Sequence, residues 1–129
     1  RNLNDLKMQK LAIEHLAVDE SEPRLAGISL SVADVANAGG EPEDWGDLVE
    51  VPRSLRGNEV AYLVRERVGK DGKPVCKASM RSNPPFTVGA VAQTYGGGGH
   101  AQAAGATIPG TLPEVMALLL PALRAACRG

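Results

Sequence analysis

The spacing of hydrophobic residues predicts two helices near the start of the chain, with a short strand between them. A hydrophobic stripe at helical spacing predicts a first helix that runs from a cap at Asn2 or Asn4 to about Val18. Apolar residues at 25–30 predict a short strand. Ser31 then precedes a second stripe and has an acidic residue three positions later, so we expect a capped second helix there.

Three hydrophobic stretches in the middle of the chain predict strands at 48–51, 59–68 and 75–82. The last two flank Asp71 and Gly72, a dipeptide typical of tight hairpin turns. We therefore expect the last two strands to pair as an antiparallel hairpin.

A run of four glycines, Gly96–Gly99, interrupts the last third of the chain. Thr87 is a candidate cap for a third helix, which the glycine run should end. After the glycines, the sequence predicts a short helix from about His100 to Gly105 and a closing strand at 106–108.

The final helix begins at Thr111, with Glu114 in the capping-box position. Pro121 within it is expected to kink the helix or to remove one backbone hydrogen bond. Strands interspersed with helices, together with one hairpin, predict an α/β (α+β) fold. We expect a single domain with a mixed β-sheet of about five strands and helices packed on it.

The composition is typical of a globular protein, because 43% of the 129 residues are hydrophobic and 22% are charged. The longest strongly apolar run, 115–120, is too short to cross a bilayer, and we recognise no secretory leader, so no membrane partner is expected. Cys76 and Cys127 lie far apart, so we expect no disulfide framework and a reduced, cytoplasmic protein. Because the sequence starts at Arg1 and a helical pattern follows at once, we expect a part of a longer protein.

Charge is divided unevenly along the chain, although the net charge is only −1. Residues 1–50 hold 4 Lys or Arg and 11 Asp or Glu, a net charge of −7, whereas residues 51–129 carry +6. The basic residues concentrate between Arg53 and Arg81, just before the glycine run. This asymmetry favours binding of an anion to one side of the molecule, and a solvated basic strand pair explains it equally well.

The glycine run is a candidate anion site. Backbone N–H groups at a glycine-rich turn that leads into a helix form an anion-binding concavity. The P-loop pattern fails because Ala106, not lysine, follows Gly105, and the dinucleotide-binding pattern is weak because a helix precedes the glycines. A flexible linker or a simple helix break is the remaining alternative.

The predicted strand at 75–82 has one polar face, because side chains alternate along a strand. Lys77, Ser79 and Arg81 share that face, and Arg and Ser side chains suit phosphate oxygens. The alternative is an ordinary exposed sheet face, which many strands have.

His100 follows the glycines directly and is well placed to donate a hydrogen bond to an anion; a capping or packing histidine is the alternative. No second His or Cys stands at ligand spacing, so we expect no metal site in this chain. The chain has four aromatic residues, too few for an extended stacking platform and enough to stack one or two bases.

Three segments resemble one protein family. Residues 97–105, GGGHAQAAG, resemble the G-G-G-H-x-x-A-A-G signature of the DHH phosphoesterases, in their DHH-associated C-terminal domain. Residues 77–82 resemble its K-x-S-x-R-S strand, and residues 52–61 resemble its P-R-S-I-x-G-x-E-V-A segment, with Asn58 where valine is more usual. Within the family, the resemblance is closest to the bacterial bifunctional oligoribonuclease and phosphoadenosine phosphate (pAp) phosphatase.

The resemblance implies a two-domain, metal-dependent enzyme of which this chain is the substrate-binding part. The catalytic domain of the family carries an Asp-His-His motif and binds a pair of divalent metals, usually manganese, and this chain has no such motif. We therefore expect no catalytic residue and no metal ligand in this chain, and no hydrolysis by the chain alone. The implied partners are short oligoribonucleotides or pAp, the DHH domain of the parent protein, and a second copy in a homodimer.

The resemblance also assigns residues to the binding site. The implied substrate-binding residues are Arg53, Lys77, Ser79, Arg81, Gly97, Gly98, Gly99 and His100. The resemblance implies that Arg53 and Lys77 are supporting cations and that His100 assists at the phosphate. Residues 1–47 are expected to form a helical bridging segment, and residues 48–129 the core of the substrate-binding domain. A single-strand exonuclease, a tRNA-editing protein and a cyclic dinucleotide phosphodiesterase are alternative parents.

Overall fold

The computed structural model describes residues 2–42 and 44–129; Arg1, on which the expectation of a longer protein rests, lies outside them. The helical elements of the described residues are α1 (Leu3–Glu14), α2 (Val32–Ala36), the 3-10 helix η1 (Trp45–Val49), α3 (Glu50–Arg53), α4 (Gly89–Thr94) and α5 (Leu112–Ala126). The strands are β1 (Leu16–Val18), β2 (Leu25–Leu30), β3 (Val60–Val68), β4 (Pro74–Ser82), β5 (Gly98–His100) and β6 (Ala103–Pro109).

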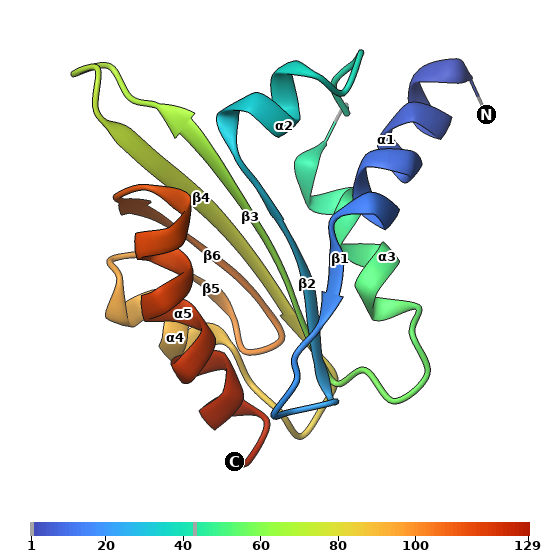
Figure 1. The fold of residues 1–129 in the computed structure, drawn as a ribbon. Helices are drawn as coiled ribbons and strands as arrows, with labels where there is room; N and C mark the ends of the chain where they lie inside the picture. Colours follow the sequence, from blue (N-terminus) through green and yellow to red (C-terminus); the bar gives the residue numbers. More distant parts are fainter. Residues whose placement is uncertain (1, 43) are drawn as a thin grey trace.

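The strands of the described residues form one six-stranded sheet in the order β1-β2-β3-β4-β6-β5 (Figure 1). Strands β2 and β3 run parallel, and the other neighbours are antiparallel. The predicted α/β fold with a mixed sheet is therefore confirmed, with one strand more than expected. β1 and β2 belong to the sheet although they lie in the segment 1–47.

Helices pack on both faces of the sheet (Figure 1). On one face, α4 and α5 bury the apolar side chains of β3, β4 and β6 in the larger core cluster. On the other face, α1 and η1 bury apolar side chains of β2 and β3 in a second cluster. These second-face helices cover mainly β2 and β3 and reach β4 only through η1, so the half formed by β4, β6 and β5 is left largely open on that face.

The capping predictions for the second and last helices are confirmed. The Ser31 hydroxyl accepts a hydrogen bond from the Asp34 N–H at 3.1 Å, and the Asp34 carboxylate accepts the Ser31 N–H in return. Thr111 and Glu114 form the same reciprocal box at the start of α5. α5 continues through Pro121, whose missing N–H leaves one intrahelical bond unmade.

Four sequence predictions of local structure are wrong. The first helix ends at Glu14, and the next residues pair with β2 as strand β1. Residues 48–51, expected as a strand, belong to η1 and α3. Thr87 does not cap α4, whose cap residue is Val88. Residues 98–105, expected to include a helix, form the β5–β6 hairpin because the backbone N–H and C=O groups of the glycines pair with β6.

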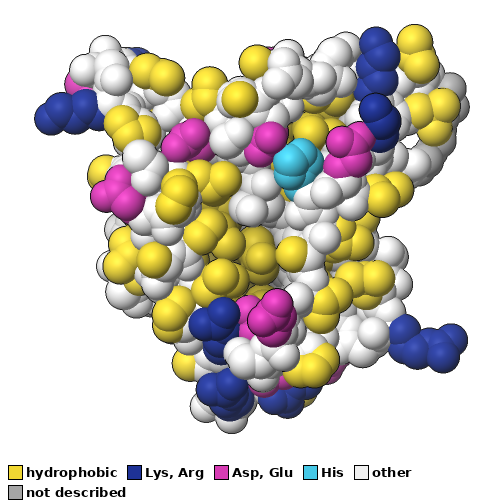
Figure 2. Space-filling view, in the orientation of Figure 1, with side chains coloured by type: hydrophobic (Ala, Val, Ile, Leu, Met, Phe, Trp, Pro, Cys, Tyr) yellow, Lys and Arg dark blue, Asp and Glu magenta, His cyan; other side chains and the backbone are white. Residues whose placement is uncertain are grey.

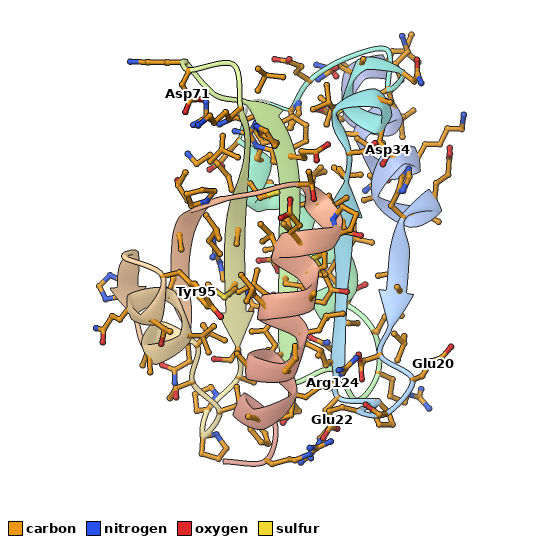
Figure 3. The ribbon with its side chains drawn as sticks, turned by 60° about the vertical axis from the view of Figure 1, so that its left-hand side comes forward. Glu20, Glu22, Asp34, Asp71, Tyr95 and Arg124 are labelled. Carbon is orange, nitrogen blue, oxygen red and sulfur yellow. The ribbon has the colours of Figure 1, made fainter. Side chains whose placement is uncertain are left out.

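Two salt bridges connect α5 and the segment after it to the turn between β1 and β2: Arg124 pairs with Asp19, and Arg128 pairs with Glu22. Figure 3 shows Arg124 and Glu22 in this region. The Arg124 guanidinium donates to both carboxylate oxygens of Asp19, at 2.9 to 3.1 Å. Glu22 is 4% exposed and accepts two side-chain hydrogen bonds from Arg24, each 2.8 Å long. Hydrogen bonds from Arg24 lower the pKa of Glu22 from its ordinary 4.5 to about 2.

Both cysteines are free and buried, and burial raises the pKa of each thiol to about 11. Within residues 2–42 and 44–129, no helix combines the length and the apolar character needed to cross a membrane.

Candidate functional site

The polar face of β4 lies on the open side of the sheet. Cys76, Ala78 and Met80 are buried against α4 and α5. Lys77, Ser79 and Arg81 alternate with them and therefore point to the opposite face, where Lys77 is exposed and the other two are half-buried.

Strand pairing brings the glycine run to the same face. Ser79 lies opposite Gly105 of β6, and Gly105 lies opposite Gly98 of β5, so these three residues form one row across the sheet. In the neighbouring row, Ala103 separates Arg81 from His100. Neighbouring strands lie about 4.8 Å apart, which puts the Cα atoms of Arg81 and His100 about 10 Å from each other. The intervening residues are Gly and Ala, so the floor between these side chains is low.

The first two glycines of the run end α4. Gly96 has a φ of 77°, the left-handed conformation that glycine adopts without penalty. Its N–H donates to the Gln93 carbonyl at 3.1 Å, and the Gly97 N–H donates to the Ala92 carbonyl at 2.8 Å. This is the hydrogen-bond pattern of a Schellman motif, which confirms that the glycines terminate the third helix.

The glycine run is therefore not the amide nest at a helix start that the sequence predicts. The N–H groups of Gly96 and Gly97 are already bonded to α4, and no helix follows. Gly98–His100 instead forms an edge strand, which leaves alternate N–H groups on its outer side without a strand partner. The glycines let the backbone approach β6 closely: a methyl group on Gly97 would lie 2.7 Å from the Ala106 side chain.

Two open hollows meet on this face of the sheet and share Lys77 and Ser79. The hollow on the glycine side has a volume of about 460 Å³ and is lined by Lys77, Ala78, Ser79, Gly96, Gly97, Gly98, Gly105, Ala106 and Thr107. The hollow on the β3 side has a volume of about 300 Å³ and is lined by Asp44, Trp45, Gly46, Leu63, Arg65, Lys77, Ser79 and Arg81.

Two residues of the second hollow, Trp45 and Arg65, were not predicted from the sequence. Arg65 lies directly opposite Lys77, and its guanidinium carbon lies 4.7 Å from the centre of the Trp45 ring. Arg65 is the first of three consecutive charged residues after an apolar run, so the segment 59–68 has no alternation that would assign this side chain to a face. The hairpin register decides on which face it lies relative to Lys77. For Trp45, no sequence signal links η1 to β4.

The open face is electropositive. None of the ion pairs found among the described residues involves Arg65, Lys77 or Arg81. Burial, together with repulsion from Arg67, lowers the pKa of Arg65, and the negative charge of Glu41 opposes this shift. The one acidic side chain in the lining, Asp44, accepts the Gly46 N–H at 2.9 Å and so caps η1.

Three of the predicted site residues, Arg53, Gly99 and His100, do not line either hollow. Arg53 lies at the end of α3, where its guanidinium donates to the Glu50 carboxylate at 3.0 Å. His100 is exposed at the end of β5, in the row of Arg81 and beyond the lining of the glycine-side hollow. The remaining five predicted residues line one hollow or both.

A separate hollow lies between α1, η1 and α3, on the acidic part of the molecule. Its lining includes the carboxylates of Asp5, Asp44, Asp47 and Glu50. These charges repel phosphate. In the described part of the chain, no group of three or more His, Cys, Asp or Glu side chains is arranged to hold a metal ion.

The side of the molecule that carries α5 differs from the β4 face. Figure 2 shows hydrophobic side chains over the centre of that side, with Lys and Arg near its margins. Lys77, Ser79 and Arg81 project from the opposite face of the sheet, away from α5.

Comparison with solved structures shows the fold. An exopolyphosphatase-related protein from Bacteroides fragilis is 21% identical and superposes with a TM-score of 0.82 over 100% of this chain and 37% of its own length. The pGpG-specific phosphodiesterase PggH from Vibrio cholerae is 13% identical, with a TM-score of 0.62 over 97% of this chain and 39% of its own. This chain therefore spans less than two fifths of either protein. No curated protein sequence matches it significantly.

Comparison with protein families identifies the chain more directly. The sequence pattern of the DHHA1 domain matches residues 27–129, which include the polar strand face, the glycine run and all of the sheet from β2 onward except the first two residues of that strand. The segments 52–61, 77–82 and 97–105, on which the sequence resemblance rests, all lie within this match. The chain belongs to the DHHA1 domain family of the DHH phosphoesterases.

Proposed function

We propose that this chain is the substrate-binding domain of a metal-dependent DHH phosphoesterase and that it holds substrate phosphate on the open face of β4. The observation that carries the proposal is the shared lining of the two hollows. Lys77 and Ser79 belong to both, Arg81 extends one, and the glycine run forms the wall of the other. Sequence segments far apart in the chain thus supply cations, a hydroxyl and bare backbone to one surface.

Each of these groups has a distinct role toward a phosphate. The planar Arg81 guanidinium can donate two parallel hydrogen bonds to phosphate oxygens, and Lys77 contributes a compact positive charge. The Ser79 hydroxyl adds a neutral donor between them. Gly98 and Gly105 keep the floor low, so a phosphate can approach the backbone. His100 and Arg53 remain candidates for outer contacts with a longer substrate.

The catalytic metal ions of the family do not fit the described residues of this chain, which have no cluster of metal-ligating side chains. We therefore assign a manganese pair to the DHH domain that accompanies DHHA1 domains, where such ions activate water for attack on phosphorus. The role of this chain is to bind and orient the substrate, and we expect it to bind substrate without hydrolysing it.

The proposed substrate is a short oligoribonucleotide or pAp. Lys77 and Arg81 lie four residues apart on one strand, so the basic row is about 13 Å long and spans more than a single phosphate. The similar fold of a pGpG-specific phosphodiesterase favours linear dinucleotides as a second candidate substrate class. A single-strand exonuclease, a tRNA-editing protein and a cyclic dinucleotide phosphodiesterase are further parents in which the same face would bind a nucleotide backbone.

Calorimetric titration of this chain with pAp tests the proposal. We expect Arg81→Ala to weaken binding at least tenfold, which corresponds to about 1.4 kcal/mol, because the bidentate donor is removed. Arg56→Ala is the matched control: it removes the same group from an exposed position outside both hollows and should leave the affinity unchanged. Equal affinities of the Arg81→Ala and Arg56→Ala variants, with both folded, would contradict the assignment of the site.

A further inference from the structure

The hollow on the β3 side is lined by an aromatic ring and a guanidinium group in addition to the proposed phosphate-binding residues. Trp45, the first residue of η1, and Arg65 of β3 stack with the guanidinium carbon 4.7 Å from the ring centre. Both side chains line the same hollow as Lys77, Ser79 and Arg81. A planar platform therefore stands directly beside the proposed phosphate row.

The platform is held in place from several sides. Trp45 packs against the core cluster that η1 forms with α1 and β3. The next residue, Gly46, lies against the site itself: a Cβ there would be 3.3 Å from Nη2 of Arg81. Arg65 is fixed by its place in β3 opposite Lys77. The position of the ring relative to β4 is thus set by the fold.

A second stacked pair in the molecule provides a contrast. Arg24 lies 5.6 Å from the centre of the Phe86 ring, and its guanidinium also makes two hydrogen bonds to Glu22. That pair has a structural explanation. For Arg65, no carboxylate partner is found among the described residues, and its charge faces the hollow with that of Lys77.

We propose that Trp45 and Arg65 form a nucleobase-stacking subsite, which places a base beside the phosphates bound along Lys77 to Arg81. The inference rests on the proposed phosphate site and adds the place where the base of the proposed nucleotide substrate is held. Bases stack on aromatic rings and on guanidinium planes. The hollow of about 300 Å³ lies at the lower end of the range for small-molecule sites. Stacking tolerates any base, because every base has a flat face, so affinity should depend little on sequence.

Trp45 is the only tryptophan of the chain, so its fluorescence reports on the subsite directly. We expect pGpG and pAp to change the Trp45 emission, and inorganic pyrophosphate, which has no base, to leave it unchanged. Trp45→Leu should weaken pGpG binding at least fivefold, about 1 kcal/mol, and should leave pyrophosphate affinity as it is. Trp45→Phe keeps a flat ring and should retain most of the affinity. Phe86→Leu, at the other stacked pair, is the control and should change neither the pGpG affinity nor the pyrophosphate affinity.

Three outcomes would overturn the inference, and they can be told apart. If pGpG binds in a calorimeter while Trp45 emission and the affinity of Trp45→Leu stay unchanged, stacking is wrong and the phosphate site stands. If Trp45→Leu loses pyrophosphate and pGpG equally, Trp45 has only a structural role. If no phosphate ligand binds the wild-type chain, the proposed function fails, and the subsite fails with it.

Discussion

At the scale of single residues, neighbouring glycines of the run have different roles: Gly97 is needed for packing, and Gly98 borders the proposed binding site. Gly97 is pressed against β6, where a methyl group would lie 2.7 Å from the Ala106 side chain and also meet the Gly105 carbonyl oxygen. Gly98, one residue later, has no neighbouring atom within 4 Å of such a methyl group and has no left-handed φ. Its row, shared with Gly105 and Ser79, puts the added group on the open face.

Two alanine substitutions should therefore act differently. Gly98→Ala should leave the urea-unfolding free energy nearly unchanged and should lower pAp affinity several-fold, because the methyl group narrows the approach to Ser79. Gly97→Ala should lower the unfolding free energy by about 1–3 kcal/mol, because overpacking forces the backbone or Ala106 to move. Full pAp affinity in a folded Gly98→Ala variant would count against phosphate binding at the glycine wall.

At the scale of elements, the sequence predicted β3, β4 and α5 well. β3 begins with a continuous apolar run, β4 alternates between buried and polar residues, and α5 has a helical stripe and a capping box. It predicted only the end of β6, as a strand at 106–108, and expected a helix where β5 and the start of β6 lie. The small residues of 96–106 carry no period, and pairing of β6 with β4 and β5 decides their structure. The polar face of β4 was predictable from β4 alone.

Hairpin register explains why Arg65 could not be predicted. A two-residue turn at Asp71 and Gly72 would pair Arg65 with Ala78, and side chains would then fall on the wrong faces. The observed loop has five residues, with Gly69 N–H bonded to the Lys73 carbonyl at 2.8 Å, and it pairs Arg65 with Lys77 instead. One residue of register thus decides whether Arg65 belongs to the core side or to the site.

The link between α5 and the β1–β2 turn should make stability depend on acid pH. The carboxyl pKa values of Asp19 and Glu22 are lowered, by Arg124 and Arg24 respectively, that of Glu22 to about 2. Because the pKa of Glu22 is lower in the folded state, its ionised carboxylate stabilises the fold at every pH above the unfolded-state pKa of 4.5. This stabilisation is lost as the pH falls from 4.5 toward 2 and Glu22 becomes protonated.

Urea unfolding followed by circular dichroism between pH 6 and pH 2 measures this effect. Wild type should be more stable than Glu22→Gln at pH 6, and the difference should shrink as the pH falls from 4.5 toward 2, because Glu22 becomes protonated. A difference that stays constant over this range would show that the charge of Glu22 does not stabilise the fold.

At the scale of the whole molecule, the uneven coverage of the sheet creates the site. α4 and α5 bury side chains from β2 to β6 on one face, whereas on the other face α1, η1 and α3 cover mainly β2 and β3 and only η1 reaches β4. The uneven charge along the sequence matches this arrangement. The acidic N-terminal part forms α1 and η1, which cover β2 and β3, and the basic part forms β4, whose polar face is open. The sequence showed the charge asymmetry, and only the fold shows that the open half of the sheet carries the basic strand face.

Amide chemical shifts during titration of this chain with pAp test the central claim most directly. The account predicts that the largest shift changes map to 77–81 of β4, to Gly98 and to Gly105, with little change along the face packed against α5. Changes confined to the acidic hollow between α1 and α3, or to α5, with the β4 amides unmoved at saturation, would contradict it.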